Sequence, residues 1–303
     1  MIKKILLTGG SGFIGTAVTA EAAKKNIDFH NISNVMGNCK YPDKTTLLPL
    51  SDKNGLKKCL NEYKPDAVIH MAAISSFVHE NRSEVYDVNV CGTENLLDAI
   101  KQTCNNGVRV LLFSSAMVYG NRDIEFFKET DGFNPNNHYS CSKVNMEFIS
   151  RNYADCMDIR IVRPFNIIGP GQSGGFVVPK LINAFNERLR EIKLGNLYPV
   201  RDYVDVEYAA ETVIRFLSLD ALEYSVLNIC SGIGHSLQDV IDMLIRITNF
   251  EPLINISEEY KRPDEINRMV GSNERIKEVM SLKLPDLLEI VLKRMLKGAR
   301  HEL

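Results

Sequence analysis

The sequence predicts an α/β protein built on a doubly wound parallel sheet, followed by a smaller α/β lobe. Two observations predict this fold. Short apolar runs alternate with helical patterns through the first half of the chain, as in parallel sheets that helices cover on both faces. From about Gly169 the alternation gives way to loops rich in glycine and proline and to isolated helices. We expect a sheet domain over residues 1–168, with later returns near 200–232, and a second lobe over residues 169–303.

The expected elements follow in chain order. Apolar runs predict strands at Lys4–Thr8, Asp28–Ser33, Thr45–Leu50, Ala67–Ala72, Val108–Ser114, Ile159–Pro164 and Val226–Cys230. Helical patterns predict helices at Gly12–Lys25, Lys53–Tyr63, Ser83–Thr103, Tyr139–Tyr153, Ser236–Thr248 and Asp286–Lys297. The strand at Ala67–Ala72 runs into small residues, where we expect another group to approach the backbone closely.

Bulk composition excludes several classes of protein. The chain has 303 residues, 45% of them hydrophobic and 24% charged, and a formal net charge of -2. A charge this small gives no electrostatic reason to expect nucleic acid or an anionic membrane as a partner. Met1 leads directly into a strand, and no run approaches the roughly 20 apolar residues of a membrane span. We therefore expect a cytoplasmic protein.

The seven cysteines are scattered and odd in number. They form no Cys-x-x-Cys pair, and no cluster of histidine and cysteine has zinc spacing. We expect reduced thiols and no metal site.

A glycine-rich turn connects the first strand to the first helix. Its sequence, Thr8-Gly9-Gly10-Ser11-Gly12-Phe13-Ile14-Gly15, fits Gly-x-Gly-x-x-Gly from Gly10 and also Gly-x-x-Gly-x-x-Gly from Gly9. Such glycines permit a tight turn and let a pyrophosphate reach the N–H groups at the start of the helix. The position after a strand and before a helix predicts a dinucleotide site in a Rossmann fold. A tight turn without a ligand is the alternative.

The residue at the end of the second strand bears on the choice of dinucleotide. Sites selective for NAD usually carry an acid there, which binds the ribose 2′-OH. Ser33 falls at this position and Asn34 follows, so no carboxylate repels a 2′-phosphate, and both side chains could donate to one. No arginine lies nearby, and the nearest cation is Lys40. This pattern favours NADP(H), while NAD(H) remains possible.

Tyr139 and Lys143 form a Tyr-x-x-x-Lys pair, and residues four apart share one face of a helix. A cation beside a phenol lowers the tyrosine pKa from its usual value of about 10, which suits a proton donor and acceptor. Such pairs also arise by chance on solvated helices, so the context of the pair decides its meaning.

These motifs together resemble the extended short-chain dehydrogenase/reductase family of the NAD-dependent epimerase/dehydratase type, over essentially the whole chain. In the segment Phe113–Gly120, alignment on Val118-Tyr119-Gly120 gives Ser115 the position of the family's catalytic hydroxyl. Asp87–Leu97 resembles the helix that builds a homodimer with the Tyr/Lys helix. The second half is similar to the GDP-4-keto-6-deoxy-D-mannose reductases of this family, on the motifs Arg163–Gln172, Phe176–Pro179, Gly195–Leu197, Arg201–Val206, Leu227–Gly232 and Arg262–Asp264.

The resemblance implies a set of site residues. Catalysis falls to Ser115, Tyr139 and Lys143. Cofactor contacts fall to Gly9, Gly12, Phe13, Ile14, Gly15, Ser33, Asn34, Leu50, Ala72, Ala73, Tyr139, Lys143 and Pro164. Substrate contacts fall to Ser75, Ser115, Asn166, Val177, Arg201 and Arg262, with the two arginines on the diphosphate, as guanidinium chemistry suits. Pro49 departs from the family, whose members often carry an aspartate near the adenine there.

The implied reaction is the NAD(P)H-dependent reduction of the C4 ketone of a nucleotide-linked 4-keto-6-deoxyhexose. The best guess is GDP-4-keto-6-deoxy-D-mannose going to a GDP-rhamnose type of product, in the synthesis of deoxysugar precursors. Family members that dehydrate carry an acid pair after the catalytic hydroxyl, whereas this chain has Ala116 and Met117, which move no proton. Two alternatives stay open: a 4-epimerase with tightly bound NAD, and a non-catalytic dinucleotide-binding regulatory protein.

Overall fold

The computed structural model describes residues 2–35, 39–75, 81–105, 107–221, 223–260, 265–281, 283, 285 and 287–298. The chain divides into two compact units. Unit 1 consists of Met1–Gly120, Gly132–Pro164 and Ala210–Leu227. Unit 2 consists of Asn121–Asp131, Phe165–Ala209 and Asn228–Leu303.

A seven-stranded sheet with the order β10-β6-β5-β4-β1-β2-β3 forms the centre of unit 1. Its strands are β1 (Lys4–Thr8), β2 (Asp28–Ser33), β3 (Thr45–Leu47), β4 (Ala67–His70), β5 (Val108–Phe113), β6 (Met157–Pro164) and β10 (Val226–Ile229). From β3 to β6 every neighbouring pair is parallel. The doubly wound parallel sheet is confirmed, and the carboxyl ends of these six strands meet at one edge.

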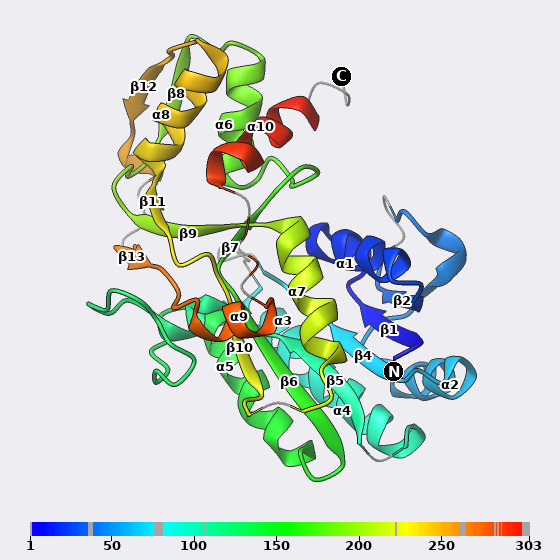
Figure 1. Ribbon diagram of the computed structural model, residues 1–303. Coiled ribbons are helices and arrows are strands. Elements are labelled where there is room, and N and C mark those ends of the chain that lie inside the picture. The colour runs from blue at the N-terminus through cyan, green and yellow to red at the C-terminus, as the bar shows by residue number, and fades with distance from the viewer. Residues whose placement is uncertain are drawn as a thin grey trace. The chain divides into compact units, whose positions relative to one another are not determined.

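Helices cover both faces of this sheet (Figure 1). The helices α2 (Lys53–Tyr63), α4 (Gly92–Thr103) and α5 (His138–Ser150) lie on one face. Leu60, Ile100 and Met146 of these helices pack against Val68 and Leu112 of the sheet in one buried cluster. The opposite face carries α1 (Phe13–Lys24) and α7 (Val206–Ser218) (Figure 1). Most predicted bounds are correct to within three residues, because buried strands and amphipathic helices differ clearly in period.

The helix predicted at Ser83–Thr103 is wrong as a single element. The segment consists of α3 (Arg82–Tyr86), one π-helical turn (Asp87–Cys91) and α4. Asn89 in the π turn is buried, and its amide both accepts from N of Ile74 (2.8 Å) and donates to O of Ile74 (3.0 Å). Single π turns inside helices are frequent at functional sites.

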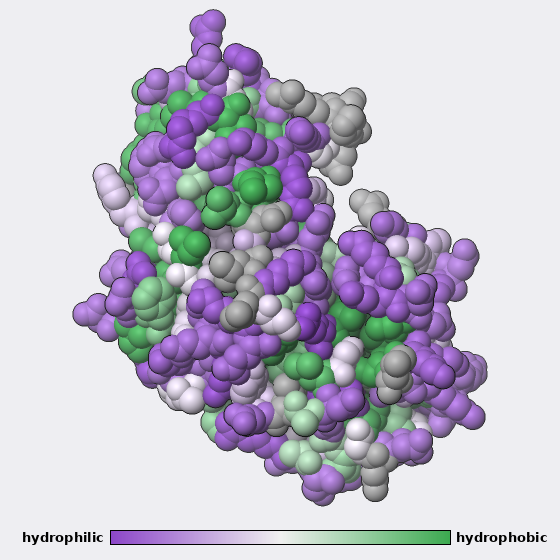
Figure 2. All heavy atoms as spheres, viewed as in Figure 1, coloured by the Kyte–Doolittle hydropathy of each residue, from purple (hydrophilic) through white to green (hydrophobic). Residues whose placement is uncertain are grey.

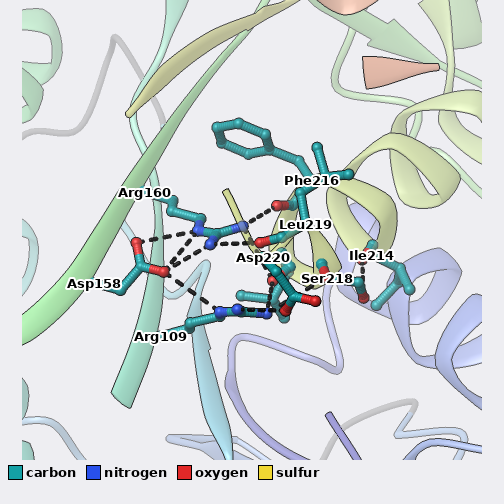
Figure 3. A network of polar contacts seen from close by, with 9 residues as sticks. Arg109, Asp158, Arg160, Ile214, Phe216, Ser218, Leu219 and Asp220 are labelled. Carbon is teal, nitrogen blue, oxygen red and sulfur yellow. Dashed lines mark hydrogen bonds and ion pairs between the residues drawn. The ribbon is translucent and has the colours of Figure 1, made fainter. Parts of the chain in front are cut away.

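Two arginines of the sheet bind the carboxyl end of α7, which carries partial negative charge (Figure 3). The fully buried Arg160 donates to the carbonyl oxygens of Phe216, Leu217 and Leu219. The Nη2 atom of Arg160 also lies 2.6 Å from the carboxylate of Asp158, which Arg109 contacts at 3.3 Å. The end of α7 is therefore tied to strands β5 and β6.

Unit 2 contains two small sheets. In the first, β9 (Val200–Asp205) pairs with β7 (Asn166–Ile168), β11 (Gly234–Ser236) and β13 (Arg268–Met269). In the second, β8 (Glu191–Leu194) pairs with β12 (Leu253–Ile256). The helices are α6 (Val177–Asn186), α8 (Leu237–Thr248), α9 (Glu274–Val279) and α10 (Leu288–Gly298). The sequence predicts α8 and α10, but glycine- and proline-rich flanks conceal α6, β7 and β9.

Hydrophilic side chains predominate on the face of the molecule that Figure 2 shows. Among the residues that the structure describes, no helix is both long and apolar enough to cross a membrane.

Candidate functional site

The glycine-rich turn lies close against the end of β4. Gly9 has a φ of +73°, and a Cβ atom there would lie 2.7 Å from N of Ala72. A Cβ atom on Gly15 would lie 2.2 Å from O of Gly9, so the turn holds no larger residue at either position. The helix α1 starts after Gly12 without a side-chain cap and without an acid in its first turn. Its N–H groups therefore suit an anion, and the turn fits a dinucleotide pyrophosphate.

Phe13, Ile14 and Gly15 form the first turn of α1, as the sequence predicts. The neighbouring helices differ at this end, because Asp52 caps α2 and Asn137 caps α5. Of α1, α2 and α5, only α1, which follows the glycine-rich turn, begins without a side-chain cap.

Ser33 ends β2 and is buried. Its hydroxyl donates to O of Val35 at 2.6 Å and lies 3.1 Å from the hydroxyl of Ser11. Because a carbonyl oxygen only accepts, the single proton of Ser33 is used on Val35, and Ser11 is the donor to Ser33. Ser33 therefore has no proton left for a 2′-phosphate. The expectation of NADP(H) rests on the exposed Asn34 and on Lys40, whose Nζ atom lies 5.6 Å from the centre of the Tyr41 ring.

The other residues expected to contact the cofactor also follow strand ends of unit 1. N of Ala72 donates to the hydroxyl of Thr8 at 3.2 Å, which holds the residues after β4 beside the glycine turn. Leu50 accepts at its carbonyl oxygen from Asn95 at 3.0 Å. Pro164 is the last residue of β6. Ala73 follows Ala72 and is half-buried, whereas Ser75 is exposed.

Ser115, Tyr139 and Lys143 come together beyond the end of β5. Ser115 begins the short 3₁₀ turn Ala116–Tyr119, and a side-chain hydrogen bond joins Ser115 to Tyr139. Tyr139 and Lys143 lie on α5, and the Nζ atom of Lys143 is 6.0 Å from the centre of the Tyr139 ring. The same Nζ atom donates to O of Phe113 at 2.7 Å. The structure thus brings together the three residues predicted to be catalytic.

Burial has the largest effect on the pKa values of Tyr139 and Lys143. Burial raises the pKa of Tyr139 above its ordinary value, and the hydrogen bond from Ser115 opposes this rise. Burial lowers the pKa of Lys143 to about 8, and the carboxylate of Glu147 opposes this fall. The sequence predicts that Lys143 lowers the Tyr139 pKa, and this lowering is not found. The ammonium group of Lys143 is directed at O of Phe113, and burial of the phenol raises the Tyr139 pKa. At neutral pH the pair is a neutral phenol beside a cation, which suits donation of a proton.

The positions that follow Ser115 hold no group that ionises. Ala116 is buried and Met117 is half-buried, and N of Met117 donates to the hydroxyl of Ser115 at 3.2 Å. The site therefore lacks the acid pair that water elimination requires.

A buried polar chain that the sequence does not reveal lies behind the turn. His70 accepts from Thr8 (2.6 Å) at Nδ1 and contacts the hydroxyl of Thr93 (2.9 Å) at Nε2. Thr93 donates to O of Asn89 at 2.7 Å. Asn89 donates to the hydroxyl of Ser142 at 2.9 Å. Ser142 in turn donates to O of Tyr139 at 2.7 Å, so the chain joins the end of β1 to the catalytic turn of α5.

The residues expected to contact substrate from unit 2 lie on two strands and one helix. Asn166 is exposed at the start of β7, and Arg201 is half-buried on the neighbouring strand β9. Val177 is the first residue of α6 and is 40% exposed, so its side chain is open to a ligand. Arg262 lies outside the described residues.

Asp202, next to Arg201, is a buried carboxylate that the sequence analysis did not single out. It accepts from N (2.8 Å) and Oγ (2.6 Å) of Ser231, from N of Gly232 (2.9 Å) and from N of Gly271 (3.2 Å). Burial raises the pKa of Asp202 to about 6 against these hydrogen bonds. The carboxylate fixes β9 to the loops that follow β10 and β13.

No cluster of three histidine, cysteine, aspartate or glutamate side chains that could hold a metal ion occurs in the described part of the chain.

Comparison with known proteins agrees with this geometry. The chain is 35% identical to a GDP-6-deoxy-D-talose 4-dehydrogenase of Aggregatibacter actinomycetemcomitans, over 91% of each chain. It is 28% identical to a GDP-6-deoxy-D-mannose reductase of Pseudomonas aeruginosa, over 93% of this chain and 92% of the other. A crystal structure of a candidate epimerase from Burkholderia cenocepacia has a TM-score of 0.88 at 31% identity and covers 99% of this chain and 98% of its own.

A sequence model described as the NAD dependent epimerase/dehydratase family matches residues 5–230. This match contains the glycine turn, Ser115, Tyr139 and Lys143. The chain belongs to the NAD dependent epimerase/dehydratase family.

Proposed function

We propose that this protein is a nucleotide-sugar oxidoreductase that reduces the C4 ketone of a GDP-linked 4-keto-6-deoxyhexose with NAD(P)H. One observation carries the proposal. Tyr139 is half-buried, hydrogen-bonded to Ser115 and one turn from Lys143, and Ala116 and Met117 supply no further acid or base. Such a site can protonate one oxygen atom of the substrate but lacks the second acid or base that water elimination requires.

The dinucleotide supplies the hydride equivalent when it is bound. Tyr139 donates its phenolic proton to O4 of the sugar as negative charge develops on that atom. Ser115 hydrogen-bonds the same oxygen and holds it in line with Tyr139. Lys143 places a positive charge 6.0 Å from the centre of the ring that carries the phenolate after proton donation.

The substrate half of the site is proposed from unit 2. Arg201 and Arg262 bind the diphosphate, and Asn166 and Val177 contact the sugar nucleotide, together with Ser75 of unit 1. The names of both curated relatives support GDP as the nucleotide. The relative with 35% identity acts on 6-deoxy-talose, which favours a talose-type product over the rhamnose type that the sequence suggested.

We also propose that α4 and α5 form the interface of a homodimer. The exposed Phe148 on α5 supports an interface there, since its side chain is 48% exposed. Light scattering at micromolar concentration tests the dimer, which we expect at about twice the mass of the 34.2 kDa chain.

The test is an assay with GDP-4-keto-6-deoxy-D-mannose, in which absorbance of NADPH or NADH is followed and the product is identified by NMR. We expect consumption of reduced cofactor and a sugar with an alcohol at C4, whose configuration then separates talose from rhamnose. Conversion of a nucleotide sugar to its C4 epimer without net consumption of cofactor would instead make the protein an epimerase. If the GDP sugar is not converted, the dTDP and CDP 4-keto sugars are assayed next, and binding of dinucleotide without turnover of any of them would favour the regulatory alternative.

A further inference from the structure

A buried ion pair joins α5 to β6 in unit 1. Glu147 and Arg163 have side chains that are 2% and 4% exposed, and two hydrogen bonds join them: Nη2 to Oε2 at 2.7 Å and Nε to Oε1 at 2.9 Å. The guanidinium of Arg163 also donates to the hydroxyl of Tyr119 at 3.0 Å and lies 5.1 Å from the centre of that ring. A pair with this geometry is rigid, because both charged groups are fully engaged and out of water.

Each end of this pair is adjacent to a residue of the proposed site. Glu147 follows Lys143 by one turn of α5 and also accepts from the hydroxyl of Ser114, the residue before Ser115. Arg163 precedes Pro164, the last residue of β6. The pair therefore ties together the three elements that carry Ser115, Lys143 and Pro164.

A buried ion pair contributes little net free energy to folding, because desolvation of the two charges offsets their attraction. Stability alone is therefore a weak explanation for the presence of this pair. The contacts to Ser114 and the position beside Lys143 point to a second role. We propose that Glu147 and Arg163 are positioning residues, which fix Ser115 relative to Lys143, with the Glu147 carboxylate held as a negative charge one turn along α5 from Lys143. This inference rests on the proposed function for the roles of Ser115 and Lys143.

The charged and titratable groups around Lys143 are few in the described part of the chain. On α5 they are Tyr139 and Glu147, and on β4 His70 lies close enough for the ammonium charge to act on it. The pKa of His70 is lowered to about 3, chiefly by burial, so His70 is neutral at physiological pH. Burial raises the pKa of Tyr139, so Tyr139 is neutral as well. Glu147 is thus the negative charge that opposes the effect of burial on Lys143.

The same strand provides a matched control. Arg160 lies three residues before Arg163 on β6, so the two side chains point to opposite faces of the sheet. Arg160 is equally buried, but its hydrogen bonds run to Asp158 and to the carbonyl oxygens at the end of α7 (Figure 3). Arg160→Met therefore measures how the loss of a buried arginine on β6 changes the melting temperature without a direct change at the proposed site.

The first experiment is Glu147→Gln, which keeps the shape of the side chain and removes its charge. Two readouts are followed: the pH dependence of kcat/KM, and the pKa of Lys143 from NMR of protein with ¹³C-labelled lysine, with the signal assigned by its loss in Lys143→Met. We expect both the alkaline limb of activity and the Lys143 pKa to move down by about one pH unit. Arg160→Met should lower the melting temperature and move neither. The NMR readout needs no turnover, so failure of the proposed function is separate from failure of this inference.

The second experiment is the double variant Glu147→Met with Arg163→Met, which replaces the pair by apolar groups that pack without unpaired charge. If the pair positions the site, the double variant regains most of the melting temperature that Arg163→Met alone loses, while kcat stays at least tenfold below wild type and the Lys143 pKa stays low. Recovery of both kcat and the Lys143 pKa together with stability would overturn the inference. An unchanged Lys143 pKa in Glu147→Gln would overturn it as well.

Discussion

His70 donates a hydrogen bond from Nε2 to the hydroxyl of Thr93, 2.9 Å away. The direction of this bond follows from its neighbours. The single proton of Thr93 goes to O of Asn89, so Thr93 accepts from His70. Nδ1 of His70 is then the acceptor for the hydroxyl of Thr8, which itself accepts from N of Ala72. A neutral His70 with its proton on Nε2 therefore connects the glycine turn to the π turn before α4.

Thr93→Val tests this connection. Valine has the shape of threonine but leaves Nε2 of His70 without its hydroxyl partner in a buried place, which costs about 1–3 kcal/mol for an unpaired group. We expect a lower melting temperature and at least about tenfold weaker dinucleotide binding, measured by fluorescence titration, because a loss of about 1.4 kcal/mol in binding corresponds to that factor. Thr93→Ser should restore binding.

Thr103→Val is the control for this variant. Thr103 lies on the same helix and donates to O of Ala99 at 2.7 Å, as Thr93 does to Asn89, but none of the histidines that the structure describes is hydrogen-bonded to it. We expect dinucleotide binding to stay within about twofold of wild type in this variant, since Thr103 takes no part in the buried chain. Equal losses of binding in the two variants would contradict the proposed connection.

Cofactor choice is predicted to respond to a carboxylate at the end of β2. Ser33→Asp places an acid where a 2′-phosphate would be repelled and a 2′-OH would be bound. We expect kcat/KM with NADPH to fall at least about tenfold and that with NADH to change less than about threefold, since repulsion of about 1.4 kcal/mol is sufficient.

Ser33→Ala separates the roles of charge and hydroxyl. Because Ser33 already donates to Val35, its removal should leave the ratio of NADPH to NADH activity nearly unchanged. A large loss of NADPH preference in Ser33→Ala would mean that this hydroxyl turns to the phosphate when cofactor binds.

Asp202 is predicted to make stability fall as pH rises through the acid range. Its folded-state pKa of about 6 lies above the ordinary 3.8, so the folded protein binds more protons than the unfolded chain between these values. Its contribution is complete below about pH 4 and is lost as pH rises through about 6, with a size of about 3 kcal/mol at most from the pKa difference.

Urea unfolding of wild type and Asp202→Asn at several pH values measures this effect. An amide does not titrate and replaces one acceptor oxygen by a donor that faces N–H groups, so the variant should be less stable throughout. The difference between the two proteins should be largest near pH 4 and should shrink by pH 7. A constant difference would show that Asp202 stays ionised over this range.

Much of unit 1 follows from the sequence because local signals there agree with tertiary structure. The strand Lys4–Thr8 and the helix Lys53–Tyr63 begin and end where their patterns predict. The glycine turn is recognisable because only glycine fits at Gly9 and Gly15, where backbone atoms lie too close for a Cβ atom. Steric requirements of this kind can be recognised in the sequence because they demand glycine at fixed positions.

The polar groups behind the site leave no such mark. Glu147 and Arg163 are 16 residues apart, and His70 is 23 residues from Thr93, so only the packing of α4 and α5 on the sheet brings them together. The sequence does not predict the π turn either, because Asn89 stabilises it through hydrogen bonds to Ile74, which lies in the loop after β4. The pKa of Tyr139 shows the same limit, since spacing predicts a lower value whereas burial raises it.

The central claim is that Tyr139 protonates the sugar oxygen during reduction at C4. The most direct measurement compares Tyr139→Phe with wild type in the assay with GDP-4-keto-6-deoxy-D-mannose, alongside dinucleotide binding. Tyr63→Phe on α2 is the control. Among the described residues, the Tyr63 hydroxyl hydrogen-bonds only to the carboxylate of Asp28. We predict that Tyr139→Phe lowers kcat by about 10²–10⁴-fold, the usual contribution of a general acid, while dinucleotide binding and Tyr63→Phe stay close to wild type. Near-normal kcat in Tyr139→Phe would contradict the account.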